Sequence, residues 1–224
     1  MERKYYEAYD DRYTQVHGEN LQWFASSPSP IVWEAADRYK IKGKILEIGC
    51  GEGRDAGFLL ERGMDVLGTD VSPAAIRYAR KKYPVFADQF RVLDCLTEKM
   101  DEKFDFIYAV AVIHMLVLDE DRNGFYRFIR EHLTPKGMAL ICTMGNGEWE
   151  MQSDIAAAFD VQKRIHEPTG REVHIAGTSC RVVSWETFRR ELAENGLVIV
   201  EQGITAVEPD FPQMMYALVE KGEM

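Results

Sequence analysis

The chain has 224 residues, of which 46% are hydrophobic and 29% charged, with a formal net charge of −10. These values fit one globular domain and argue against nucleic acid as the main partner, because phosphate binding needs clustered Lys and Arg. No apolar run reaches the length of a membrane span, and residues 1–5 lack the apolar core of a signal peptide, so we expect a cytoplasmic protein with no membrane partner.

Residues 1–40 precede the first core strand and are rich in aromatic side chains. Four tyrosines recur at roughly helical spacing and a tryptophan follows: Tyr5, Tyr6, Tyr9, Tyr13, Trp23. Such a stripe packs against the rest of a fold, and it also suits a lid over a ligand pocket. Pro28 and Pro30 interrupt the segment, and a helix is expected over residues 31–39.

Strand and helix patterns alternate over residues 41–144. Strands are expected over residues 45–48, 65–70, 90–93, 104–112 and 138–144. A helix begins near Gly53, another follows the Ser72-Pro73 cap, and a third ends before Pro135 and Gly137. This βαβ alternation predicts a parallel sheet with right-handed crossovers.

Residues 145–183 break this rhythm, and residues 184–224 restore it. The first stretch is interpreted as an insertion that holds one helix and a hairpin. Ser184 should cap a helix that Gly196 ends, and strands are expected over residues 197–201 and 214–220. The whole chain is therefore predicted to form a single α/β domain.

The sequence is organised around Glu47-Ile48-Gly49-Cys50-Gly51-Glu52-Gly53, which reads E-x-G-x-G-x-G. A buried strand ends there in a bare glycine loop, and a helix N-terminus follows. Glycine lets the backbone turn sharply and lets a ligand lie directly on it, so this arrangement predicts a nucleotide-type ligand site. A dinucleotide fingerprint would need a third glycine at the position of Arg54.

The E-x-G-x-G-x-G pattern resembles motif I of class I S-adenosylmethionine-dependent methyltransferases. The Gly-Arg-Asp continuation at residues 53–55 is similar to the small enzymes of the tellurite-resistance and thiopurine type. The resemblance covers about residues 40–144, and the final helix and two strands by pattern. It implies a Rossmann-like, seven-stranded, mostly parallel sheet, with helices on both faces and the last strand inserted antiparallel between the fifth and sixth. It also implies S-adenosylmethionine as cofactor, N-terminal helices over the pocket and a small-molecule methyl acceptor.

Two acids mark the ends of the next strands. Asp70 lies 17 residues beyond Gly53, where a carboxylate can accept both ribose hydroxyl hydrogens. The resemblance implies that Asp94 accepts the adenine amino group and that the Cys95 N–H faces the ring. Either acid could instead be a loop or helix-capping carboxylate.

The resemblance further places Glu47 near the amino-acid tail of the cofactor and the Ala109 carbonyl at its amine. Arg54 could pair with the cofactor carboxylate or with a helix neighbour. The predicted cofactor-binding residues are Glu47, Gly49, Cys50, Gly51, Gly53, Arg54, Asp70, Val71, Asp94, Cys95 and Ala109.

His114, after the fourth strand, is the candidate general base, because its titration range suits proton transfer. The candidate acceptor-binding residues are Tyr9, Tyr13, Trp23, His174 and Arg181. The last two could read an anionic substrate or could lie on an exposed hairpin. The four cysteines form no C-x-x-C pair, so no metal site is predicted.

Two other functions are compatible with the sequence. One is an NAD(P)-dependent oxidoreductase, which Arg54 disfavours because it replaces the third glycine of the fingerprint. The other is a cofactor-binding protein of the same fold that transfers nothing. The oligomeric state is left as monomer or homodimer.

Overall fold

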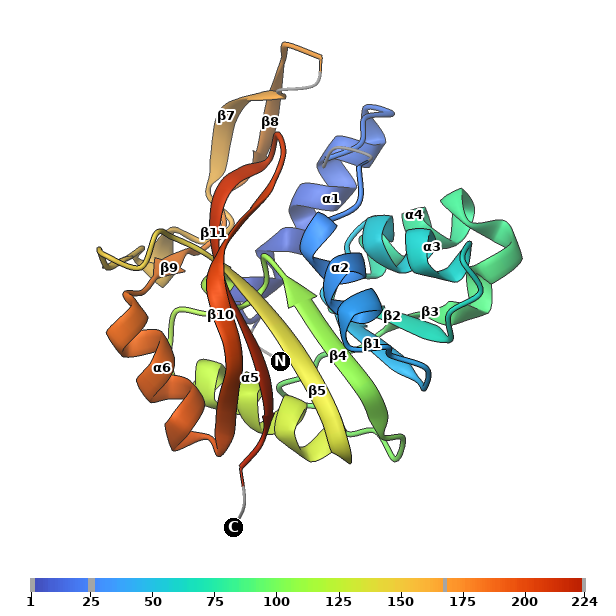
Figure 1. Ribbon diagram of the computed structural model, residues 1–224. Coiled ribbons are helices and arrows are strands. Elements are labelled where there is room, and N and C mark those ends of the chain that lie inside the picture. Colours follow the sequence, from blue (N-terminus) through green and yellow to red (C-terminus); the bar gives the residue numbers. More distant parts are fainter. Residues whose placement is uncertain (1–2, 24–26, 167–168, 223–224) are drawn as a thin grey trace.

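The computed structural model describes residues 3–23, 27–166 and 169–222, and its centre is a seven-stranded sheet (Figure 1). The strand order is β10-β11-β5-β4-β1-β2-β3. Strand β11 runs antiparallel to both β5 and β10, and the others run parallel. The strands are β1 Ile45–Ile48, β2 Val66–Asp70, β3 Phe90–Val92, β4 Phe104–Val110, β5 Leu133–Met144, β10 Leu197–Val207 and β11 Phe211–Lys221. The predicted Rossmann-like sheet, with its last strand between the fifth and sixth, is confirmed.

Helices cover both faces of this sheet (Figure 1). Leu46 and Ile48 pack with α5 (Asp119–His132) and α6 (Trp185–Glu194) on one face. Ile45 faces the opposite way, because successive strand side chains alternate. The helices on that side are α2 Pro30–Arg38, α3 Arg54–Leu60 and α4 Pro73–Lys82. Burial on both faces explains the continuous apolar runs of the central strands.

Two helices begin at the serine caps expected from the sequence. The Ser72 hydroxyl accepts a hydrogen bond from the Ala75 N–H at 3.0 Å, and Pro73 occupies the first turn of α4. The Ser184 hydroxyl accepts one from the Thr187 N–H at 3.3 Å at the start of α6. These bonds satisfy N–H groups that a helix start leaves open.

The ends of several predicted strands differ from the structure, and β5 begins at Leu133 rather than at residue 138. Strand β4 ends at Val110 rather than at residue 112, because Ala111 has φ +60° and turns the chain out of the sheet. The hairpin of β10 and β11 is longer than expected and turns only between Val207 and Phe211. Residues 202–205, which lie beyond the predicted strand end at residue 201, pair in register with β11.

The insertion at residues 145–183 is built from strands. Strands β7 (Val161–His166) and β8 (Arg171–Ala176) form the expected hairpin, and β6 (Met151–Gln152) pairs with β9 (Arg181–Val182). In place of the expected helix there is one 3-10 turn, Ile155–Ala157.

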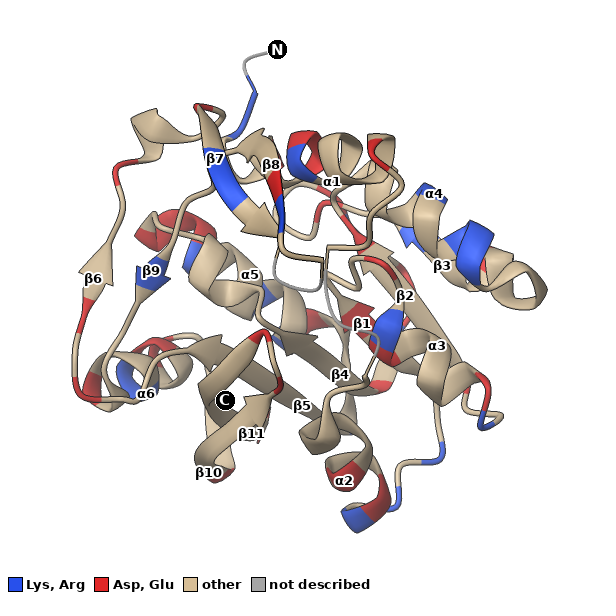
Figure 2. Cartoon of the chain, turned by 90° about the horizontal axis from the view of Figure 1, so that it is seen from above, with Lys and Arg blue, Asp and Glu red and all other residues tan. Residues whose placement is uncertain are grey.

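The N-terminal segment consists of a 3-10 turn, η1 (Tyr5–Glu7), and helix α1 (Ala8–Gly18). Helix α1 lies between α4 and the β7–β8 hairpin, as the view from above shows (Figure 2). The Arg12 guanidinium donates to the Ala176 carbonyl at 3.0 Å, and the Asp10 carboxylate accepts from the Ser72 hydroxyl at 2.7 Å. The N-terminal segment is thus bonded to both neighbours.

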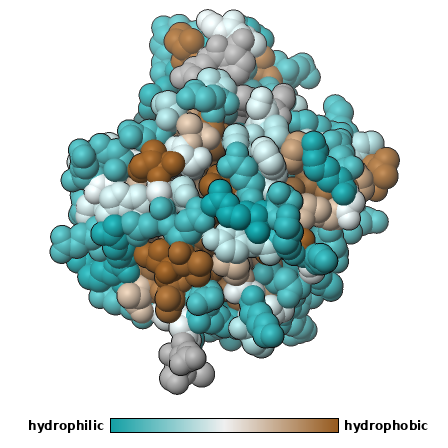
Figure 3. Space-filling model, viewed as in Figure 1, coloured by the Kyte–Doolittle hydropathy of each residue, from teal (hydrophilic) through white to brown (hydrophobic). Residues whose placement is uncertain are grey.

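The surface of the sheet edge is partly apolar. Val198, Val200 and Ile204 of β10 are exposed, and a brown patch lies over this strand in Figure 3. Within the described ranges, no helix is both long enough and apolar enough to cross a membrane.

Candidate functional site

The loop after β1 is shaped by its three glycines. Gly49, Gly51 and Gly53 all have positive φ, at +72°, +52° and +77°. A Cβ on Gly49 would lie 2.4 Å from Val112 Cγ2, and one on Gly51 would lie 2.6 Å from Tyr13 Oη. Both the backbone angles and the surroundings therefore require glycine, and the loop presents bare backbone to the space beside it.

Asp70, at the end of β2, is held against this loop. Its Oδ2 accepts a hydrogen bond from the Gly51 N–H and its Oδ1 from the Ser72 N–H, each at 2.8 Å. Burial raises the pKa of Asp70 to about 6, although both N–H donors favour the charged form. Each oxygen keeps a lone pair for a further donor, so the carboxylate is both fixed in place and able to bind.

Asp94 follows β3 and is shared between its own loop and the N-terminal segment. Its oxygens accept hydrogen bonds from the Leu96 N–H (2.9 Å), the Thr97 hydroxyl (2.9 Å) and the Tyr6 hydroxyl (3.0 Å). The role of a loop carboxylate, one of the alternatives from the sequence, is therefore present, and Asp94 also lines the cavity. Among the described residues, the adjacent Cys95 N–H has no hydrogen-bond acceptor.

Glu47 lies in β1, just before the glycine loop, and Arg54 is the first residue of α3, just after it. The Glu47 carboxylate accepts from the Ala56 N–H (2.9 Å) and the Tyr108 hydroxyl (3.0 Å), and burial raises its pKa well above the usual range. Arg54 pairs with its helix neighbour Asp55 at 3.2 Å. Its Nη1 lies 3.7 Å from an oxygen of Asp210 and is buried without a hydrogen bond to any described residue. One corner of this guanidinium is thus available to an acceptor.

These groups border one cavity at the carboxyl ends of β1 to β4. It encloses about 1000 Å³ of space between atoms, part of it open to solvent. Tyr6, Tyr9 and Tyr13 of the N-terminal segment line it, and Phe211 reaches it from the start of β11. Ligands of open α/β sheets bind at this edge, so the cavity is the candidate site.

Most of the residues predicted from the sequence lie at this cavity. Those that line it are Glu47, Gly49, Cys50, Gly51, Arg54, Asp70, Val71, Asp94, Cys95, Tyr9 and Tyr13. Gly53 and Ala109 do not line it. Gly53 begins α3 and packs against Phe90, while Ala109 is 1% exposed within β4, and the next three residues, 110–112, face the cavity instead.

Four further predicted residues lie outside the cavity. The Trp23 N–H donates to Glu52, and its ring packs beside Arg12. His174 is exposed on β8, and Arg181 donates to the Val117 carbonyl and to Asp119. His114 is buried and not among the lining residues, and burial lowers its pKa to about 4.

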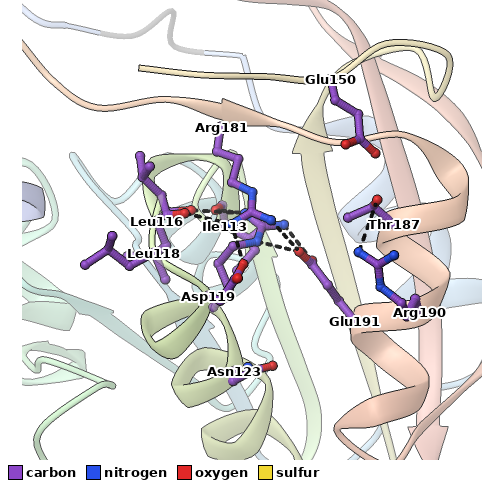
Figure 4. A network of polar contacts seen from close by, with 12 residues as sticks. Ile113, Leu116, Leu118, Asp119, Asn123, Glu150, Arg181, Thr187, Arg190 and Glu191 are labelled. Carbon is purple, nitrogen blue, oxygen red and sulfur yellow. Dashed lines mark hydrogen bonds and ion pairs between the residues drawn. The ribbon is translucent and has the colours of Figure 1, made fainter. Parts of the chain in front are cut away.

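A buried network fixes the loop that follows β4. Arg122 donates two hydrogen bonds to Glu191, at 2.8 and 2.7 Å, and its Nη1 donates to the Ile113 and Leu116 carbonyls. Arg181 lies beside Glu191 in the same network (Figure 4). Since Leu116 lines the cavity, α5 and α6 hold one of its walls.

Several lining residues were missed in the sequence. Tyr6 belonged to the recognised tyrosine stripe, but the spacing did not show which tyrosines face inward. Glu52 lay within the glycine motif, yet its partners His17 and the Trp23 N–H come from distant segments. Phe211 gave no signal, because the length of the β10–β11 hairpin was underestimated.

Comparisons with known proteins agree with this fold. Residues 46–139 match a family described as "Methyltransferase domain". Hemagglutinin 1 of Eikenella corrodens is 32% identical over 111 residues, which are 46% of this chain and 36% of that protein. A 2-heptyl-1-hydroxyquinolin-4(1H)-one methyltransferase of Mycobacteroides abscessus is 36% identical over 58 residues, or 26% of each chain.

Among solved structures, one similar to this chain is 1,6-didemethyltoxoflavin-N1-methyltransferase of Burkholderia thailandensis, with bound 1,6-didemethyltoxoflavin and S-adenosylhomocysteine. The TM-score is 0.70 at 13% identity, and the match covers 96% of this chain and 88% of that one. The chain has the fold of this methyltransferase, and its residues 46–139 are similar to a methyltransferase domain. It matches about a third and about a quarter of the lengths of the two curated relatives. Within this methyltransferase fold, the cavity lies at the strand ends where a ligand is expected.

Proposed function

We propose that this protein binds S-adenosylmethionine in the cavity and transfers its methyl group to a small-molecule acceptor. The observation that carries the proposal is the alignment of three successive strand ends on one cavity: bare glycine backbone after β1, Asp70 after β2 and Asp94 after β3. The related proteins named for small acceptors, a hydroxyquinolinone and a didemethyltoxoflavin, support the acceptor class.

The residues at the cavity fit the cofactor. Asp70 would accept the ribose hydroxyl hydrogens, and Asp94 with the Cys95 N–H would bind adenine. The Nη1 of Arg54, which lies 3.7 Å from an Asp210 oxygen and makes no hydrogen bond to a described residue, would receive the cofactor carboxylate, an ion pair suited to Arg. The carbonyls near Val110 would meet the amine, one residue beyond the predicted Ala109.

When bound, the cofactor supplies a methyl group made electrophilic by the sulfonium. An acceptor lone pair would take up this methyl group, and the electron pair of the C–S bond would return to sulfur. The protein's own contribution is to orient the two reactants and to exclude water, and orientation can lower the barrier by about 7–11 kcal/mol. The N-terminal segment, whose tyrosines close one side of the cavity, is proposed as the lid.

No side chain of this chain is assigned as the base. His114, the candidate from the sequence, lies outside the cavity, and its neutral ring packs against Phe211 at 5.9 Å between centroids. We therefore propose that His114 supports the wall of the cavity, and that the methylated product loses any proton to solvent after its release.

Three further properties belong to the proposal. The protein acts in the cytoplasm, as a monomer or homodimer, without a nucleic-acid partner; the net charge of −10 supports the last point.

Calorimetric titration with S-adenosylhomocysteine tests the proposal. We expect saturable binding by the wild-type protein and loss of most of the heat in Asp70→Ala. NADH should give no heat; binding of NADH but not of S-adenosylhomocysteine would favour an oxidoreductase. Cofactor binding without methyl transfer to a broad acceptor panel would favour a non-catalytic binding protein.

A further inference from the structure

Acidic side chains outnumber basic side chains at the lining of the cavity. Five carboxyl groups line it, those of Glu47, Glu52, Asp55, Asp70 and Asp94. Arg54 is the one basic residue among its described lining residues, and it is paired with Asp55. Even without Glu47, whose pKa burial raises well above its usual range, acidic groups outnumber basic ones at the lining.

Three other basic side chains that could bind an anion do not line the cavity. Arg12 donates to the Ala176 carbonyl on the outer side of α1. Arg181, which was predicted from the sequence as a candidate for binding an anionic substrate, donates hydrogen bonds to the Val117 carbonyl and, at 2.6 Å, to Asp119. His174 is exposed on the hairpin. None of these three is among the lining residues.

The walls away from the glycine loop are apolar or aromatic. Met115 and Leu116 follow β4, and Phe211 begins β11. Tyr6 and Tyr9 face them from the N-terminal segment. Aromatic faces and edges pack well against other rings, and the aliphatic side chains offer a ring no polar partner.

We infer that the methyl acceptor is an uncharged ring compound and not an organic anion. This inference rests on the proposed function, because it places the acceptor in the part of the cavity that the cofactor leaves open. An anionic group there would lose its water without gaining a cation, which disfavours binding, and the carboxylates at the other end of the cavity would repel it at longer range. An uncharged ring would bury apolar surface against Tyr9, Met115 and Phe211.

Two probe compounds that have nearly the same shape but differ in charge distinguish an effect of charge on binding from an effect of size. 4-Hydroxyquinoline-2-carboxamide is neutral at pH 7, and 4-hydroxyquinoline-2-carboxylate is anionic. Each is titrated calorimetrically into protein saturated with S-adenosylhomocysteine. We expect the amide to bind about tenfold or more tightly than the acid. Equal or tighter binding of the acid, or binding of neither probe, would overturn the inference.

A substitution within the cavity checks that charge is the cause. Met115 is half-buried in the cavity wall, so Met115→Arg should raise the affinity of the acid relative to the amide by about tenfold. Leu118→Arg, three residues along and exposed outside the cavity, should leave the ratio unchanged. If both variants shift the ratio alike, the cavity is not where the probes bind. Saturation by S-adenosylhomocysteine is measured first, so failure of the proposed function is seen separately.

Discussion

At the scale of single residues, Asp70 links proton binding to ligand binding. Burial raises its pKa to about 6, and the ionised carboxylate is the better acceptor for hydroxyl hydrogens. The affinity for S-adenosylhomocysteine should therefore be full well above pH 6 and fall below it, by up to about tenfold per pH unit. Calorimetry across this range measures the fall. Asp70→Asn should bind weakly with no inflection near pH 6, and an unchanged inflection in this variant would assign the titration to another group.

Gly51 tests whether the bare loop is needed for binding. In Gly51→Ala the new Cβ would lie 2.6 Å from Tyr13 Oη. A Cβ added at Gly63, where φ is +77°, would meet no atom within 4 Å. Both substitutions put alanine into a left-handed conformation, at a cost of about 1–2 kcal/mol in stability. Only Gly51→Ala should also lower the affinity for S-adenosylhomocysteine, by about tenfold or more. Equal affinities in the two variants would remove the loop from the site.

The residues of the cavity that could be predicted from the sequence are those whose position follows from the strand or loop that carries them. The glycine loop and the acids after β2 and β3 were visible because the carboxyl ends of successive parallel strands meet at one edge. The backbone N–H partners of Asp70 follow from the same geometry. Phe211 reaches the cavity from a distant segment, and Glu52 is held there by His17 and the Trp23 N–H, so both depend on tertiary packing that no local pattern encodes.

At the scale of elements, one carboxylate of helix α1 caps α4, beside the packing of Tyr13 on Ala74 and of His17 on Tyr78. Asp10 Oδ1 accepts from the Ser72 hydroxyl at 2.7 Å and from the Ala74 N–H at 2.9 Å, at the N-terminus of α4. Asp10→Ala should loosen α1 by about 1–2 kcal/mol. Hydrogen exchange within residues 8–18 should then be roughly tenfold faster or more.

Asp11→Ala is the matched control for this change. Asp11 lies on the same turn but pairs with Arg3 at the exposed surface, an interaction of small value. Exchange in α1 should stay near that of the wild type. Equal acceleration in both variants would show that Asp10 does not fasten the helix.

Whole elements were predicted better than their ends. The period of apolar residues identified the alternating strands and helices, and the Ser-Pro and Ser caps placed two helix starts. The end of β4 and the turn between β10 and β11 were misplaced, because the positive φ of Ala111 and the pairing of residues 202–205 with β11 depend on their neighbours rather than on local propensity. Because the turn between β10 and β11 was misplaced, Phe211 was not recognised as a residue that lines the cavity.

At the scale of the whole molecule, the pair of Arg122 and Glu191 joins α5 to α6 beneath the cavity wall. Arg122 is 1% exposed and donates to Glu191 through two nitrogens. Glu191→Leu leaves the guanidinium buried without its carboxylate and should lower the free energy of unfolding by about 3–5 kcal/mol. Urea denaturation measures this loss.

The double variant Arg122→Met with Glu191→Leu should regain much of that stability, because no unpaired charge remains in the core. Glu194→Leu, on the exposed side of α6, should change the free energy of unfolding by less than about 0.5 kcal/mol. If the double variant were no more stable than Glu191→Leu alone, the loss would come from packing rather than from the stranded charge.

A crystal structure with S-adenosylhomocysteine tests the central claim most directly. The account predicts the nucleoside across the carboxyl ends of β1, β2 and β3, with the ribose hydroxyls on Asp70 and adenine beside Asp94 and the Cys95 N–H. The sulfur should face the space bordered by Tyr9 and Met115. A nucleoside bound elsewhere, or one that leaves the Asp70 carboxylate without a ribose contact, would contradict it.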